Sequence, residues 1–82
     1  MQITVKLFAL MREKAGTDTV VLDMPEGAKL TQAVAVLVRH YPVLEPYIAN
    51  TRFSLHMDFV DAETSLAEGD ELALIPPVSG GL

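Results

Sequence analysis

The sequence predicts an α+β fold in two layers, a mixed sheet of four to five strands with one main helix packed on one face. Residues 3–9 alternate in the way typical of a half-buried strand, and residues 71–75, before Pro76, form a second regular strand with two leucines on one face. In the middle, residues 30–41 repeat apolar side chains at helical spacing. This helix follows a hairpin, which excludes a Rossmann-like alternation. A chain of 82 residues makes one domain.

The first two strands are expected before the helix. In residues 3–9, one face carries Ile3, Val5 and Leu7, and the other carries Thr4, Lys6 and Phe8. Residues 10–15 form a charged connection that tolerates a helix and stops at Gly16. Residues 19–22 are β-branched and form a second strand, antiparallel to the first because the connection is short.

A turn at Pro25-Glu26-Gly27 leads into the expected helix. Its apolar stripe consists of Leu30, Val34, Leu37, Val38 and Tyr41. Pro42 ends the helix at or near Tyr41. Thr31 is the one good N-cap candidate, although no acidic residue stands three positions later. Residues 43–50 form a connection with one short helical turn around Pro46.

The remaining strands lie in the last third of the chain. Residues 53–60 alternate again and fit either one strand or two short strands with a tight turn near 56–58. After a turn at 67–70, residues 71–75 form the last strand, with Leu72 and Leu74 on one face and Ala73 and Ile75 on the other. The first and last strands are the most regular, so we expect them to pair centrally. This order of elements is of the β-grasp type.

Residues 76–82 are expected to form a flexible tail beyond a folded body of residues 1–75. Pro76 and Pro77 have no backbone N–H for a sheet and favour a stiff extended rod. Gly80 and Gly81 have no Cβ, so the tip is slim enough to thread into a narrow site on another protein. The alternative is a frayed terminus, because terminal residues are disordered in most domains.

Composition narrows the classes of function. The net charge of −5 disfavours nucleic acid and favours a partner with a basic face. The absence of cysteine excludes a disulfide, a thiolate zinc site and a cysteine nucleophile within this chain. The apolar run 33–38 is too short to span a bilayer, and Lys6 interrupts the N-terminal stretch that a signal peptide would need. We therefore expect a cytoplasmic protein that does not enter membranes.

The titratable residues do not form a self-sufficient active site. Neither His40 nor His56 has a second histidine or a carboxylate at metal-ligand spacing, so both are expected on the surface. The acidic residues Asp58, Asp61 and Glu63 lack the spacing and the glycine of a calcium loop. We expect no bound metal or cofactor.

Two surface features point to a protein partner. Residues 68–71, Glu-Gly-Asp-Glu, form a turn and secondarily an acidic patch for a basic partner. If the first and last strands pair, Phe8, Ala73 and Ile75 make one exposed apolar patch beside the root of the tail. In the alternative, a loop residue such as Tyr47 covers this patch.

Several short motifs together resemble the small subunit of molybdopterin synthase, a family of ubiquitin-like, β-grasp sulfur carriers. The motifs are Leu7-Phe8-Ala9, Arg12-Glu13, Gly16, Gly69-Asp70-Glu71 and the tail Pro76-Pro77-Val78-Ser79-Gly80-Gly81. The resemblance runs the whole length of the chain. The tail is its most specific part, whereas the middle is generic.

The resemblance implies a role for the tail. An activating enzyme uses ATP to adenylate the carboxylate of Gly81, next to Gly80, and a sulfur donor then displaces AMP to leave a thiocarboxylate. The large subunit binds the loaded carrier in a heterotetramer, and sulfur passes to a cyclic pterin precursor of molybdopterin. The chain itself is a non-catalytic subunit that binds no cofactor. The partner-binding residues are expected to be Phe8, Ala73, Ile75, Pro76, Pro77, Val78 and Ser79.

The sequence departs from the family pattern at two places. Leu55-His56 stands where the family usually has Val-Asn, and Leu82 follows Gly81. Three explanations of Leu82 are open: a peptidase removes it, the partner has a pocket that accepts leucine, or the chain docks without being loaded with sulfur. We favour removal, because exposed glycine-rich ends are easily trimmed.

Other functions remain open. The alternatives to this function are a sulfur carrier for thiazole synthesis, a ubiquitin-like modifier conjugated to lysines and a plain binding module.

Overall fold

The computed structural model describes residues 1–76 of the chain. In this part, five strands, three α-helices and one 3-10 turn follow one another. They are β1 (Gln2–Leu7), α1 (Ala9–Ala15), β2 (Thr19–Asp23), α2 (Leu30–His40), η1 (Pro42–Leu44), α3 (Glu45–Ile48), β3 (Arg52–Leu55), β4 (Asp58–Val60) and β5 (Glu71–Ile75). None of the described helices has the length and apolarity that crossing a bilayer requires.

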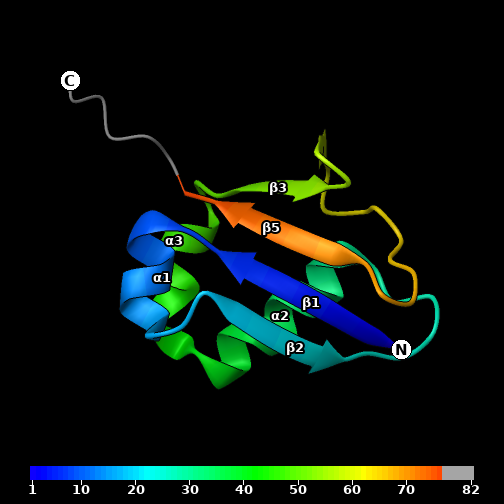
Figure 1. The fold of residues 1–82 in the computed structure, drawn as a ribbon, viewed down its shortest axis with the longest axis horizontal. Coiled ribbons are helices and arrows are strands. Elements are labelled where there is room, and N and C mark those ends of the chain that lie inside the picture. The colour runs from blue at the N-terminus through cyan, green and yellow to red at the C-terminus, as the bar shows by residue number, and fades with distance from the viewer. Residues whose placement is uncertain (77–82) are drawn as a thin grey trace.

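The five strands form one mixed sheet in the order β2-β1-β5-β3-β4 (Figure 1). The two most regular strands, β1 and β5, pair at its centre, as predicted; the structure shows that this pair is parallel, with Val5 opposite Leu72. The other pairs are antiparallel, including the predicted pair of β1 and β2. The central pairing sets the carboxyl ends of β1 and β5 side by side at one edge of the molecule.

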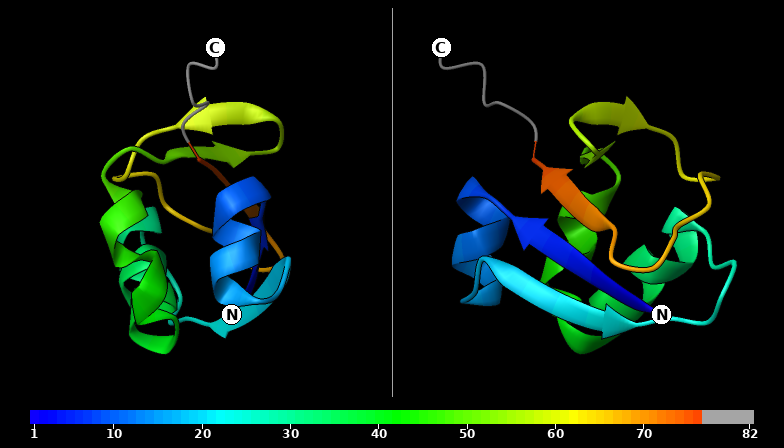
Figure 2. Two further views of the ribbon diagram at one scale, coloured as in Figure 1. Left: turned by 90° about the vertical axis from the view of Figure 1, so that its left-hand side faces the viewer. Right: turned by 45° about the vertical axis from the view of Figure 1, so that its right-hand side comes forward.

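The sheet has one covered face and one open face. The odd residues of β1 and the leucines of β5 point into a core that α2 covers on one side of the sheet (Figure 2). Fully buried members of this core are Ile3, Val5, Leu7, Leu30, Leu37, Leu72 and Leu74. The helices lie on this side, so within residues 1–76 no helix covers the opposite face of the sheet. This confirms the predicted β-grasp arrangement, with two further short helices beside the main one.

The segment expected as a helix-tolerant connection is the helix α1. Phe8, with extended backbone, precedes it, and Gly16 ends it in the left-handed conformation, φ 77°. Met11 is its one buried residue, so the segment has no apolar stripe from which periodicity predicts a helix. Its stability comes instead from packing beside η1, a tertiary contact.

The N-terminus of α2 differs from the prediction, because Thr31 lies inside the helix and Lys29 is the N-cap. The Lys29 N–H donates to Oε1 of Gln32 at 2.8 Å. The loop before β5 accepts the next two bonds: Leu30 N–H donates to the Thr64 carbonyl at 2.8 Å and Thr31 N–H to the Ala62 carbonyl at 3.0 Å. The loop before β5 therefore accepts hydrogen bonds from backbone N–H groups that a capping side chain next to the helix would otherwise accept.

Residues 53–60 form two strands, which decides between the two predicted alternatives. Leu55 pairs with Asp58, and the two residues between them, His56 and Met57, both have positive φ, 52° and 70°. Positive φ at both central positions is the geometry of a tight hairpin turn whose twist suits antiparallel strands. The turn brings β4 back beside β3 at the edge of the sheet.

Candidate docking face and tail root

The tail begins at the carboxyl end of the central strand β5. Leu74 pairs with Leu7 of β1 and with Phe53 of β3, so the end of β5 is paired with a strand on each side just before the tail begins. Ile75 is the last strand residue, and Pro76 follows it. The predicted tail residues Pro77, Val78, Ser79, Gly80, Gly81 and Leu82 lie outside the described residues.

The open face of the sheet brings the predicted patch residues together at this end. Ala73 lies between Lys6 of β1 and Ser54 of β3 in the strand register, and Ile75 lies opposite Arg52. Phe8 directly follows Leu7, the partner of Leu74, and therefore adjoins Ile75. The three residues share one face, as the strand alternation predicted.

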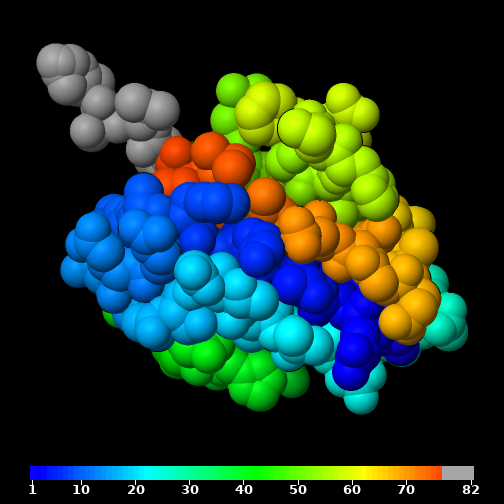
Figure 3. Space-filling model, in the orientation of Figure 1, coloured from blue at the N-terminus to red at the C-terminus, as the bar shows by residue number. Residues whose placement is uncertain are grey.

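Exposure distinguishes this patch from an ordinary strand face. Phe8 is 43% exposed, and Ala73 and Ile75 are partly exposed. Tyr47, which the alternative interpretation placed over them, instead packs against the core cluster. Figure 3 shows this side of the molecule, where β5 lies uncovered between β1 and the β3–β4 hairpin. The described residues thus leave the patch accessible.

The prediction missed one large member of the same face. Phe59 of β4 lies opposite Ser54, which lies opposite Ala73, and its side chain is 60% exposed. Arg52 places its guanidinium carbon 4.1 Å from the centre of the Phe59 ring, within cation–π range. The alternation in residues 53–60 indicates that Phe59 lies on one face of a strand. Only the hairpin turn decides which residues of β4 share a face with Ala73 and Ile75 of β5.

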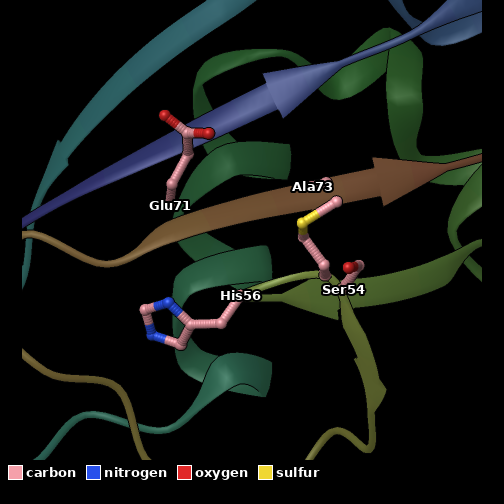
Figure 4. Close-up of a pocket in the computed structure, with 5 residues that line it drawn as sticks. Ser54, His56, Glu71 and Ala73 are labelled. Carbon is pink, nitrogen blue, oxygen red and sulfur yellow. The ribbon is translucent and has the colours of Figure 1, made fainter.

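A small hollow of about 220 Å3 lies on the open face at the start of β5. Its lining residues are Ser54, His56, Met57, Glu71 and Ala73. Figure 4 shows the side chains around β5, with Glu71 and His56 on opposite sides of the start of this strand. Ala73 belongs both to this hollow and to the apolar patch, so the two features form one continuous surface.

One wall of the hollow is fixed by a nearly buried carboxylate. Asp70 is 8% exposed, and its Oδ1 lies 3.2 Å from Nε2 of His56. Its other oxygen accepts the Ala67 N–H at 2.8 Å. The predicted surface position of His56 is confirmed, whereas its contact with Asp70 was not predicted, because the two residues are 14 positions apart and meet only through strand pairing.

The other titratable residues have structural roles or face solvent. Oδ1 of Asp61 accepts the Glu63 N–H at 2.9 Å, and Glu63 pairs with Lys29 at 3.1 Å, as befits a solvated turn. His40 is the exposed last residue of α2, where a cation favours the negative end of the helix dipole. Among residues 1–76, no three histidine or acidic side chains gather closely enough to hold a metal ion.

Comparison with known proteins places this geometry in a family. The chain is 35% identical to the molybdopterin synthase sulfur carrier subunit of Chlamydomonas reinhardtii, over 99% of this chain and all of that protein. It is 38% identical to small archaeal modifier protein 1 of Haloferax volcanii, over 93% of this chain and 97% of that protein.

Structure and sequence profile agree with these relatives. The crystal structure of SAMP1 from Haloferax volcanii superposes with a TM-score of 0.92 at 34% identity, covering 99% of this chain and all of that one. Residues 5–81 match the sequence profile of the ThiS family. The chain therefore belongs to the ThiS family.

Proposed function

We propose that the chain is a sulfur carrier for molybdopterin synthesis, the small subunit of a molybdopterin synthase. The observation that carries this proposal is the apolar patch of Phe8, Ala73, Ile75 and Phe59 at the carboxyl end of β5, from which the sequence continues into Pro-Pro-Val-Ser-Gly-Gly. A partner that binds this patch receives the tail in one defined direction. The full-length identity to a sulfur carrier subunit supports the same function.

The chemistry takes place on the terminal carboxylate of Gly81. A carboxylate is a poor electrophile, so it first attacks the α-phosphorus of ATP and releases pyrophosphate, which makes AMP the leaving group. Sulfide then attacks the acyl carbon, the bond to AMP breaks, and a thiocarboxylate remains. In the synthase, sulfur passes to the cyclic pterin precursor. The chain contributes the sulfur-bearing group, and its partners contribute the catalytic residues.

The partners follow from this chemistry. An adenylating enzyme must hold ATP over the tail, and a large subunit must hold the pterin precursor. Both must accept the tail through a narrow passage, for which Gly80 and Gly81 are suited because they carry no side chain. For the synthase we propose a heterotetramer of two large and two small subunits, each small subunit docked through the open face of its sheet.

The test is the intact mass of the chain after incubation with the activating enzyme, ATP and sulfide. Conversion to the thiocarboxylate changes the mass by the difference between one sulfur and one oxygen atom. We expect this change in the form that ends at Gly81 and not in the 82-residue form, because a leucine side chain misplaces the reacting carboxylate. Gly80→Val in the shorter form is the matched control and is expected to load slowly. A shorter form that never gains sulfur contradicts the proposal.

A second function, conjugation to protein lysines, is favoured by the identity to small archaeal modifier protein 1. Both functions need the same activated glycine, so the product distinguishes them. Mass spectrometry of cell extracts containing a tagged chain separates a thiocarboxylate from Gly81 joined to lysine side chains. A sulfur carrier for thiazole synthesis gives the thiocarboxylate too, and reconstitution with the molybdopterin synthase large subunit distinguishes that case.

A further inference from the structure

The hollow at the start of β5 has a size and lining that suit one side chain of a partner protein. Its volume of about 220 Å3 is below the range of roughly 300–1,000 Å3 that small-molecule sites occupy. It is lined by a carboxylate, a hydroxyl, an imidazole, a thioether and a methyl group, from Glu71, Ser54, His56, Met57 and Ala73 respectively. A long side chain with an apolar stem and a polar head fits such a mixture.

The charge of the hollow selects a cationic head. Glu71 is exposed, and among residues 1–76 no ion pair holds its carboxylate. Its neighbour Asp70 is engaged by His56 and Ala67, so Glu71 is the acceptor that is available to a partner. The acidic turn of residues 68–71 adds negative potential at the same place.

Part of the lining of the hollow is already in position before a partner binds. Asp70 holds the His56 ring from one side, and the small side chain of Ala73 leaves space above the strand. Met57, 97% exposed at the hairpin tip, presents a flexible thioether to the stem of an entering side chain. Asp70 and His56 are already in place and lose little freedom when a partner docks, whereas Met57 adapts to the entering side chain.

We infer that this hollow receives an arginine side chain of the large subunit, with its guanidinium paired to the carboxylate of Glu71. Arginine suits the site better than lysine because its planar fork donates two parallel hydrogen bonds to one carboxylate. The inference rests on the proposed function for the identity of the partner. Ala73 joins the hollow to the apolar patch, so one docked surface fills both.

The test compares two variants that change the net charge equally. Glu71→Gln removes the proposed acceptor, whereas Glu68→Gln removes a carboxylate of the same turn that does not line the hollow. Titration calorimetry with the large subunit is expected to show dissociation constants about tenfold higher for Glu71→Gln and within about twofold of the unmodified chain for Glu68→Gln. Equal affinities of the two variants overturn the inference. Their melting temperatures verify that both are folded.

A second measurement does not depend on the large subunit. Isotope-labelled chain is titrated with N-acetyl-arginine methylamide and, separately, with the neutral glutamine analogue, while amide chemical shifts are recorded. We expect shifts at Ser54, Met57 and Ala73 with the arginine compound alone, and their loss in Glu71→Gln. Equal shifts with both compounds, or the same shifts in Glu71→Gln, overturn the inference. If the large subunit does not bind the unmodified chain at all, the proposed function fails, and this titration decides on the hollow by itself.

Discussion

Ile75 illustrates how one residue serves both the sheet and the surface. Its backbone pairs with Arg52, which closes β5 against β3, while its side chain lies partly exposed on the open face beside Phe8. Replacing this side chain by a polar one is expected to change the free energy of unfolding of the free protein little. The same replacement is expected to weaken binding much more, because a charge in a desolvated interface is costly.

Ile75→Glu is therefore expected to weaken binding to the large subunit far more than it destabilises the fold. The new carboxylate lies opposite Arg52, a cross-strand pair of opposite charge that is favourable in the free protein. Calorimetric titration and thermal unfolding give the two quantities. Val21→Glu is the matched control: Val21 is 58% exposed on the edge strand β2, away from the tail root. Unchanged affinity of a folded Ile75→Glu variant would show that this face does not dock.

Met57 has a backbone conformation that its side chain disfavours. Its φ of 70° is left-handed, and glycine is the residue that adopts this conformation without steric cost. Met57→Gly is expected to stabilise the protein by roughly 0.5–1 kcal/mol, or a rise of about 2–8 °C in melting temperature. Met57→Ala, which removes the same side chain but keeps Cβ, is expected to bring no such gain. Equal melting temperatures of the two variants would contradict the assigned turn geometry.

At the scale of elements, α2 shows that a helix can begin without a conventional cap. The carbonyls of Thr64 and Ala62 accept the N–H groups of Leu30 and Thr31, and Gln32 reaches back to the Lys29 N–H. The loop between β4 and β5 is thereby joined to the start of the helix. The helix that covers the sheet is therefore hydrogen-bonded to the loop that leads into β5, the strand that the tail follows.

Gln32→Ala is expected to cost roughly 0.5–1 kcal/mol of stability, because the Lys29 N–H loses its acceptor. Thr31→Ala is the matched control, since Thr31 is exposed inside the first helical turn and alanine has the higher helix propensity. Chemical denaturation of both variants measures the difference. A larger loss for Thr31→Ala would mean that Thr31 is the cap after all.

At the scale of the whole molecule, charge is unevenly distributed. The chain has eleven acidic residues against six lysines and arginines. Glu68, Asp70 and Glu71 lie at the start of β5, at the end of the sheet away from the tail root. Arg52 lies at the tail root itself, opposite Ile75. Like charges at one end repel one another and reduce stability at low ionic strength.

Added salt is therefore expected to raise the melting temperature, because it screens this repulsion over distances of about 10 Å at 0.1 M. Glu71→Gln is expected to raise it by about 1–3 °C at low salt and by less at high salt. Glu13→Gln, in which the lost charge lies between Arg12 and Lys14, serves as the control and is expected to bring no rise. Thermal unfolding across a salt series measures both effects. A melting temperature that falls with added salt would contradict this electrostatic account.

The sequence by itself determined the first, second and last strands, the main helix, the central pairing of β1 with β5 and the patch of Phe8, Ala73 and Ile75, whereas it left open whether residues 53–60 form one strand or two. These follow from alternation and periodicity, which are local properties that each segment carries whatever surrounds it. The resemblance in its motifs also indicated the family, and the comparisons confirm it.

Only the tertiary structure decided which distant side chains meet. The approach of His56 to Asp70, the stacking of Arg52 on Phe59 and the capping of α2 by a loop all depend on strand order, register and the turn at His56-Met57. A shift of register by one residue moves every side chain of a strand to the other face. Register is fixed by the packing of the whole core, so no single segment of the sequence contains it.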